Sequence, residues 1–138
     1  MKLKDSFFTI EESSSATQIT VRLNSEHPIY QAHFPGEPIT PGVCIIQIAK
    51  ELLEEAMQGG NYCENDKNWQ GQYHLVAVKN VKFLAPISPL ETPLVTYTFQ
   101  KVTPSDDGTT VKAQITVEST DKLMAKLSLT LRAGKFER

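Results

Sequence analysis

The stretch that decides the fold runs from His33 to Gly60 and reads HFPGEPITPGVCIIQIAKELLEEAMQGG. It joins a proline-rich loop directly to an apolar helix. Each proline fixes its own φ angle and biases the preceding residue toward extended backbone, so the loop has few conformations; the prolines in or just before it are Pro28, Pro35, Pro38 and Pro41. Thr40 occupies an N-cap position and Pro41 the first helical position, while Gly59 and Gly60 provide the stop.

The helix that follows has two halves of different character. From Val43 to Ala49 it is apolar except for Gln47, so we expect this half to be enclosed on every side. A buried amide without partners costs about 1–3 kcal/mol, so Gln47 needs a hydrogen-bonding partner. Glu51 lies one turn further along the same stripe. In the second half we expect a buried side of Leu52, Leu53, Ala56 and Met57 and a solvent side of Lys50, Glu54, Glu55 and Gln58.

The remainder of the chain reads as antiparallel sheet. Phe7 to Glu12 and Thr17 to Leu23 predict a hairpin, and Asn24 to Ala32 a turn that includes one helical turn. After a polar loop from Gly59 to Gln72, we expect four strands: Tyr73 to Leu84 with a bend near Lys79 and Asn80, Leu94 to Val102, Thr110 to Glu118, and Leu123 to Leu131. In the last strand Leu123, Ala125, Leu127, Leu129 and Leu131 alternate with Met124, Lys126, Ser128 and Thr130, which predicts one buried and one wet face. One buried helix followed by antiparallel strands is an α+β order.

Length and composition indicate one globular domain spanning residues 1–138. The chain has 40% hydrophobic and 22% charged residues and a formal charge of −2 without a basic cluster in the sequence, which argues against a nucleic-acid surface. Cys44 and Cys63 form no metal-ligand spacing with the histidines, so we expect two free thiols in a reducing compartment. No apolar run reaches the length of a signal peptide or a membrane span, so the cytoplasm is the expected location and no membrane span is expected.

The residues His33-Phe34-Pro35-Gly36-Glu37-Pro38-Ile39-Thr40-Pro41-Gly42-Val43, with an apolar helix behind them, resemble the signature of the FabZ/FabA 3-hydroxyacyl-acyl-carrier-protein dehydratases. A weaker similarity continues through Pro28 to Ala32 and Val81 to Pro89. The resemblance implies a hotdog fold, in which a long curved antiparallel sheet wraps around one central helix. It also implies a homodimer with active sites at its interface, a substrate carried as a thioester on acyl-carrier protein or coenzyme A, and no metal or redox cofactor. The alternatives to a homodimer are a higher oligomer or a heterodimer.

Dehydration of a 3-hydroxyacyl thioester requires a base for the α-proton, a donor for the developing enolate oxygen, and a proton for the departing hydroxyl. His33 suits the first task because imidazole titrates near neutral pH. The backbone N–H of Gly42 suits the second because it lies unpaired at the positive end of the helix. Val43 and Phe34 are further candidates for contact with the substrate.

The third task is where the sequence departs from the family. Enzymes of this group place a glutamate or aspartate fourteen residues after the histidine, and this chain has Gln47 there. Glu51 follows one turn later, where the family usually has glutamine, so the Gln47/Glu51 pair is our candidate for the acid or water-positioning role. An alternative is that Glu51 is a surface charge without a role.

Two other functions compete with a dehydratase. One is a catalytically weak or inactive hotdog subunit that binds acyl thioesters or a carrier protein, supported by Gln47. The other is a hotdog thioesterase, in which Glu51 would direct water. Retention of His33 favours the dehydratase over the binding subunit, and acyl chain length and pathway do not follow from the residues.

Overall fold

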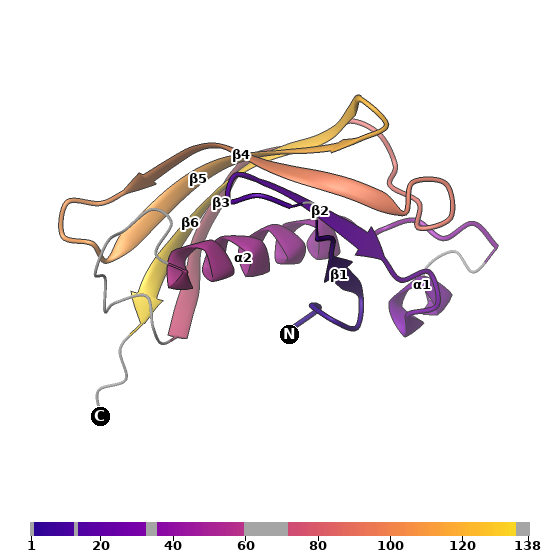
Figure 1. The fold of residues 1–138 in the computed structure, drawn as a ribbon, viewed down its shortest axis with the longest axis horizontal. Coiled ribbons are helices and arrows are strands. Elements are labelled where there is room, and N and C mark those ends of the chain that lie inside the picture. Colours follow the sequence, from indigo (N-terminus) through magenta and orange to yellow (C-terminus); the bar gives the residue numbers. More distant parts are fainter. Residues whose placement is uncertain (1, 13, 33–35, 60–71, 135–138) are drawn as a thin grey trace.

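Helix α2 (Gly42–Gln58) lies on the concave face of one curved antiparallel sheet, as Figure 1 shows. The computed structural model describes residues 2–12, 14–32, 36–59 and 72–134. Six strands in the order β1-β2-β4-β5-β6-β3 form the sheet. Their bounds, with those of the short helix α1, are β1 (Phe8–Ile10), β2 (Gln18–Leu23), α1 (Pro28–Ala32), β3 (Gln72–Phe83), β4 (Leu94–Pro104), β5 (Thr110–Ser119) and β6 (Lys122–Gly134). This confirms the expected α+β hotdog architecture.

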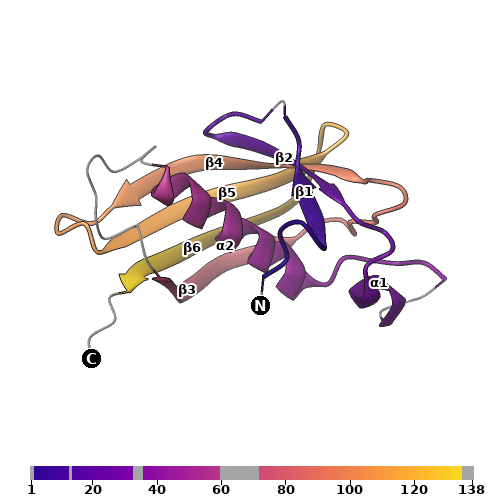
Figure 2. The same ribbon diagram turned by 60° about the horizontal axis from the view of Figure 1, so that its bottom comes forward.

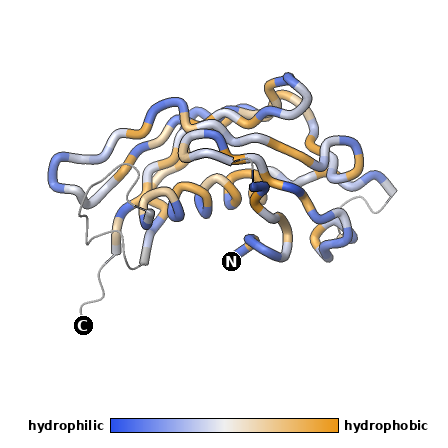
Figure 3. Tube along the Cα trace, in the orientation of Figure 1, coloured by the Kyte–Doolittle hydropathy of each residue, from blue (hydrophilic) through white to orange (hydrophobic). Residues whose placement is uncertain are grey.

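The core lies between α2 and the inner face of the sheet. Side chains of β4, β5 and β6 alternate between the helix and solvent, and the tube in Figure 3 shows the same alternation of hydropathy along these strands. Of the predicted inward residues of β6, Ala125, Leu127, Leu129 and Leu131 are buried, whereas Leu123 is only partly buried. Period-two patterning therefore predicted the buried face of β6 correctly from Ala125 onward.

Met124 departs from that alternation. We expected it to face solvent, but only 4% of it is exposed. The register between β5 and β6 shifts between Val117 and Glu118, which changes the facing of the residues at the start of β6. The carbonyl of Met124 also accepts hydrogen bonds from the N–H groups of Leu84 and Ala85, so the chain after β3 packs against it.

In the second half of α2 the buried side is as expected, and on the predicted solvent side Glu55 and Gln58 are exposed while Lys50 and Glu54 are half-buried. The first half is not enclosed on every side. Leu52, Leu53, Ala56 and Met57 are buried, whereas Val43 is 68% exposed and Ile46 is only partly buried. The reason is geometric, because the sheet covers one side of the helix (Figure 2). On the covered side, the hydroxyl of Tyr97 in β4 donates a hydrogen bond of 3.0 Å to the carbonyl of Ile45, which links the helix to the sheet.

The predicted N-cap of α2 is wrong. Pro41 is the N-cap residue, with extended backbone at φ −61° and ψ 146°, and no side chain caps the helix. The hydroxyl of Thr40 instead forms a 2.7 Å hydrogen bond with the hydroxyl of Tyr30, so it is directed away from the helical N–H groups. At the other end, Gly59 ends the helix with its N–H bonded to the carbonyl of Glu55, at a φ of −77°.

Strand β3 forms one edge of the sheet and contains the predicted bend. Its pairing with β6 is irregular between Lys79 and Lys82, where Asn80 adopts a φ of 55°. A second irregularity lies between Leu75 and Ala77. The loop from 60 to 71, with Cys63, lies outside the described residues. In the described part of the chain, no helix is long and apolar enough to cross a membrane.

The assignment of the two faces of β6 predicts different costs for neighbouring truncations. Leu127→Ala should lower the free energy of unfolding by about 2–5 kcal/mol, because Leu127 is 2% exposed and its loss leaves a cavity. Lys126→Ala, one residue earlier on the exposed face, should change it by no more than about 0.5 kcal/mol. Urea denaturation of both variants measures the difference, and equal losses would contradict the assignment.

Candidate functional site

The start of α2 presents backbone donors that the helix itself does not use. The N–H groups of Cys44 and Ile45 both donate to the carbonyl of Pro41, and these are the first bonds of the helix. The N–H groups of Gly42 and Val43 precede them. They therefore carry the partial positive charge of the helix N-terminus, which favours a negatively charged oxygen placed beside them.

A cavity of about 340 Å³ opens at this helix start. Its walls come from the end of the proline-rich loop, the first turn of α2 and the chain after β3, and are apolar apart from Thr40: Ile39, Thr40, Gly42, Ile45, Phe83, Leu84, Ala85, Pro86 and Ile87. A space of this size and polarity suits an acyl chain or a thioester arm.

The ring of Phe83 packs directly against Gly42. A Cβ atom added there would lie 2.8 Å from Cζ and 2.9 Å from Cε2 of that ring. The close approach places an aromatic side chain directly against the N-terminal turn of the helix, on the wall of the cavity. Phe83 itself is 51% exposed, so the ring can move if a ligand displaces it.

Tyr30 and Thr40 join the two ends of the proline-rich loop. Their hydroxyls lie 2.7 Å apart, and both side chains are buried. Tyr30 stacks on Phe7 with ring centroids 4.8 Å apart, and the N–H of Thr40 donates to the carbonyl of Ile87. Burial raises the pKa of Tyr30, so the hydroxyl remains protonated and able to donate at neutral pH. The loop that contains His33 is therefore held at both of its ends.

Gln47 and Glu51 are brought together, as their spacing of four residues predicts. Nε2 of Gln47 donates to Oε2 of Glu51 at 2.8 Å. Glu51 also accepts from the backbone N–H of Leu3 at 2.6 Å and from that of Lys4 at 2.8 Å. Only 5% of Glu51 is exposed, so the alternative of a solvated surface charge is wrong. These hydrogen bonds link the N-terminal segment at Leu3 and Lys4 to the helix, and they orient the side-chain amide of Gln47.

Two predicted site residues, His33 and Phe34, lie outside the described residues. Of the other predicted members, Gly42, Val43 and Gln47 lie in the first half of α2, and Glu51 lies one turn beyond Gln47. The remaining histidines are elsewhere: Nδ1 of His27 accepts from the N–H of Ile29, and His74 lies in β3. In the described part of the chain, no group of three or more His, Cys, Asp or Glu could hold a metal ion. Cys44 is a buried free thiol whose pKa is raised by burial.

Sequence reasoning missed Tyr30 and Phe83 as parts of this site. Tyr30 could have been suspected only as the aromatic member of the helical turn before His33. Phe83 belongs to the stretch Val81 to Pro89 that carries the weaker family resemblance, but nothing in the sequence indicates that its ring covers Gly42. The Phe83–Gly42 contact joins segments that are distant along the chain, and the Tyr30–Thr40 bond spans the proline-rich loop.

Comparison with known proteins gives a family and a fold. The model of the ApeI-like family, described as ApeI dehydratase, matches residues 9–126. Among curated relatives, a 3-hydroxyacyl-[acyl-carrier-protein] dehydratase FabZ of Wolbachia is 32% identical over 75 residues, covering 54% of this chain and 49% of that protein. The FabZ of Acetivibrio thermocellus is 32% identical over 91 residues, covering 65% and 58%. The chain thus spans about half the length of the curated relatives it matches.

Solved structures with the same fold have more distant sequences. A sigma28-regulated virulence protein from Campylobacter jejuni aligns with a TM-score of 0.63 at 11% identity, covering 96% of this chain and 87% of that one. A thioesterase from Haemophilus influenzae aligns with a TM-score of 0.58 at 18% identity, covering 91% and 76%. At these identities the likeness concerns the fold alone.

The hydroxyl pair at the loop ends predicts a coupled loss of stability. Tyr30→Phe and Thr40→Val should each lower the free energy of unfolding by about 1–3 kcal/mol, because each leaves the other hydroxyl buried without this partner. The double variant should lose less than the two single losses together, by about 0.5 kcal/mol or more. Urea denaturation of the three variants measures this coupling, and strictly additive losses would contradict the bond.

Proposed function

Because the chain belongs to the ApeI-like dehydratase family, we propose that it removes water from a (3R)-3-hydroxyacyl thioester to give the trans-2-enoyl thioester. The substrate is carried on acyl-carrier protein or coenzyme A, in fatty-acid or specialised lipid or polyene synthesis. The observation that carries the proposal is the first turn of α2, where the N–H of Gly42 lies on the wall of an apolar cavity.

The role of Gly42 follows from what the reaction needs. Removal of the α-proton moves negative charge onto the thioester oxygen. A backbone N–H at the positive end of a 17-residue helix stabilises that charge without rearrangement. The absence of a side chain at position 42 allows the thioester to approach the backbone. Val43 and Phe34 contact the acyl or thioester part of the substrate in this proposal.

His33 is the proposed base, on the strength of the family resemblance of its loop. The bond between Tyr30 and Thr40 supports this role, because it holds the segments on either side of the loop in a fixed relation. The proton that His33 takes from the α-carbon can be returned to the departing hydroxyl, which then leaves as water. A single imidazole can therefore both accept the α-proton and supply the proton that the leaving hydroxyl needs.

Gln47 takes the position beside the leaving hydroxyl in this proposal. Its amide can hydrogen-bond to the hydroxyl or to the water that forms, but it cannot give up a proton. Glu51 acts as a positioning residue, because its bond to Nε2 of Gln47 fixes the orientation of the amide. Of the two roles considered for the Gln47/Glu51 pair, acid or water positioning, the proposal therefore assigns water positioning.

A homodimer is part of the proposal. The helix start and strand β3 expose apolar side chains that would be covered by a second copy: Val43, Leu75, Val76, Phe83 and Leu84. Strand β3 is an edge of the sheet within the described residues and could pair with its equivalent in the partner. Sites completed by residues of two subunits would make isolated monomers inactive.

The second candidate is a subunit that binds acyl thioesters without dehydrating them. The observation that favours it is the arrangement of Glu51, whose two oxygens already accept three hydrogen bonds from N–H groups. The purified protein should be incubated with 3-hydroxyacyl-carrier-protein substrates of several lengths and followed by mass spectrometry. Loss of water supports the dehydratase, binding without conversion supports the second candidate, and a free acid indicates a thioesterase.

His33→Ala should reduce dehydration by a factor of about 10² or more, because the base is lost. The melting temperature should change little, since the prolines and the Tyr30–Thr40 bond hold the loop. His27→Ala is the matched control, because it removes a histidine that is not assigned to the site. Unchanged turnover of the His33 variant would exclude the proposed base.

The Gln47 and Glu51 variants distinguish a positioning pair from a relocated acid. Gln47→Glu should raise dehydration by a factor on the order of 10², because it introduces a carboxyl that can give a proton to the leaving hydroxyl. Glu51→Gln should destabilise the fold by about 1–3 kcal/mol, through loss of an acceptor for buried N–H groups, and should reduce turnover only modestly. Turnover assays and urea denaturation measure both effects. Abolished activity in a folded Glu51→Gln protein would instead make Glu51 the acid.

A further inference from the structure

Residues 3–8, which we call the N-terminal turn, fold back on themselves as they lead into β1. The N–H of Phe7 donates to the carbonyl of Leu3 at 2.8 Å, and the N–H of Asp5 donates to the carbonyl of Phe8 at 2.6 Å. Asp5 has a φ of 70°, in the left-handed region that is uncommon for residues other than glycine. The turn therefore depends on its surroundings to keep this shape.

The start of the turn is bound to the middle of α2. The N–H groups of Leu3 and Lys4 donate to the two oxygens of Glu51, at 2.6 and 2.8 Å, and the ammonium of Lys4 pairs with Glu55. Oε2 of Glu51, which accepts from Leu3, also accepts from Nε2 of Gln47. The backbone of the turn and the amide of Gln47 thus share one oxygen atom.

The end of the turn contacts the segment that precedes the proline-rich loop. The ring of Phe7 is fully buried and stacks on that of Tyr30, with ring centroids 4.8 Å apart and an interplanar angle of 21°. It also packs in a T-shaped arrangement with the ring of His27, at a centroid distance of 5.1 Å. Tyr30 in turn bonds to Thr40 across the loop. The turn therefore supports the side chain that closes the loop.

Packing alone does not account for the contact with α2. The apolar side chain of Leu3 would pack equally well against an apolar residue at position 51, and a buried carboxylate there costs free energy that its hydrogen bonds only offset. Glu51 is nevertheless 5% exposed and uses both oxygens. Since its remaining hydrogen bond goes to Gln47, the arrangement links the turn to the proposed water-positioning group.

The two contacts of the turn lead to two different parts of the proposed site. Reaction rates depend on how closely the reacting groups are held in their working geometry. We propose that the N-terminal turn positions both parts of the site; this inference rests on the proposed function. Leu3 orients the amide of Gln47 through Glu51. Phe7 supports the start of the proline-rich loop through Tyr30.

The first test removes one N–H and keeps every side chain. Replacing Leu3 by its α-hydroxy analogue converts the preceding amide into an ester, so the donor to Glu51 is lost. We expect kcat for a 3-hydroxyacyl thioester to fall about threefold or more with little change in KM, because the amide of Gln47 is less well oriented. The matched control is the same replacement at Leu23, a buried leucine whose N–H donates to the carbonyl of Pro93 at 2.8 Å. The control should lose similar stability and keep its kcat.

A Gln47→Leu background separates positioning from folding. If Leu3 acts through Gln47, the ester at Leu3 should lower kcat no further once the amide is absent, whereas the melting temperature should still fall. An ester that lowers kcat by the same factor in both backgrounds would overturn the role of Leu3, as would equal losses of kcat from the esters at Leu3 and Leu23.

The second contact is tested by two phenylalanines of similar burial. Phe7→Leu removes the ring that stacks on Tyr30 and should lower kcat about threefold or more. Phe8→Leu removes a ring that is equally buried but lies opposite Leu23 in the sheet, so it should lower the melting temperature comparably and leave kcat unchanged. Equal kcat losses in the two variants, or none in Phe7→Leu, would overturn the role of Phe7.

The side-chain amide of Gln47 gives a readout that needs no turnover. In protein labelled with ¹⁵N-glutamine, its NMR signal is identified by its loss in Gln47→Leu. Its hydrogen exchange should speed up about tenfold or more in the Leu3 ester, because water then reaches the pair with Glu51, and should be unchanged in the Leu23 ester. If the wild type dehydrates no thioester, the proposed function fails, and these exchange rates still decide whether the turn holds the amide. Unchanged exchange in the Leu3 ester, or equal acceleration in both esters, would overturn the positioning.

Discussion

The fold and the site both depend on how the first turn of α2 is held under the sheet. A helix start leaves N–H groups without helical acceptors, and here no side chain caps them. The turn is fixed instead by neighbours: Thr40 bonds to Tyr30 and to the carbonyl of Ile87, and Tyr97 donates to the carbonyl of Ile45. Because no side chain caps this turn, the N–H groups of Gly42 and Val43 are left without a capping partner, and in the proposed function the N–H of Gly42 binds the thioester oxygen.

The same helix explains how a polar pair can be tolerated inside the protein. A buried carboxylate and amide cost free energy unless their hydrogen bonds are made. Glu51 meets this condition through Gln47 and through the backbone of Leu3 and Lys4, which ties the N-terminal segment to the middle of α2. The position that carries an acid in the resembling dehydratases is therefore occupied by an amide that donates to a buried carboxylate. In the proposed reaction, the leaving hydroxyl must then obtain its proton from another group.

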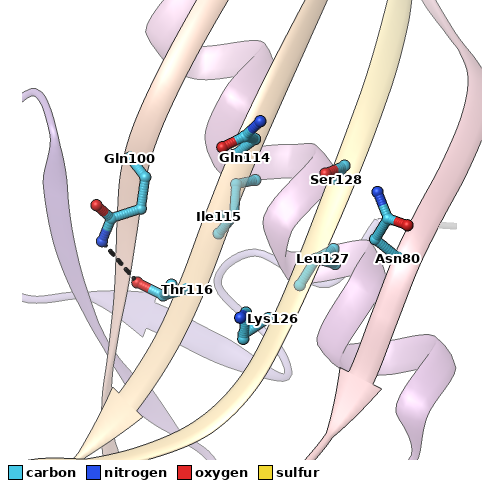
Figure 4. Close-up of a pocket in the computed structure, with 8 residues that line it drawn as sticks. All are labelled: Asn80, Gln100, Gln114, Ile115, Thr116, Lys126, Leu127 and Ser128. Atoms are coloured by element: carbon cyan, nitrogen blue, oxygen red, sulfur yellow. Dashed lines mark hydrogen bonds between the residues drawn. The ribbon is translucent and has the colours of Figure 1, made fainter.

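The two faces of the sheet differ in what they contact. Its inner face packs against α2 and forms the core, and its outer face is free of that requirement. Irregularities in β3 and β4 curve the sheet beside a polar hollow on the outer face, which Figure 4 shows with α2 behind the sheet. The edge strand β3, with its exposed apolar side chains, is suited to contact between copies of the chain.

The sequence by itself determined the elements and the buried faces of most of them. Proline before the helix, the apolar positions of α2 and the period-two pattern of β6 depend on neighbours within a few residues, so they could be read from the chain. The tertiary structure decided which partners the polar groups found. Thr40 bonds to Tyr30 rather than capping its helix, Glu51 reaches Leu3 from 48 residues away, and Phe7 stacks on Tyr30. These outcomes depend on strand register and on contacts between distant segments, which local patterns do not specify.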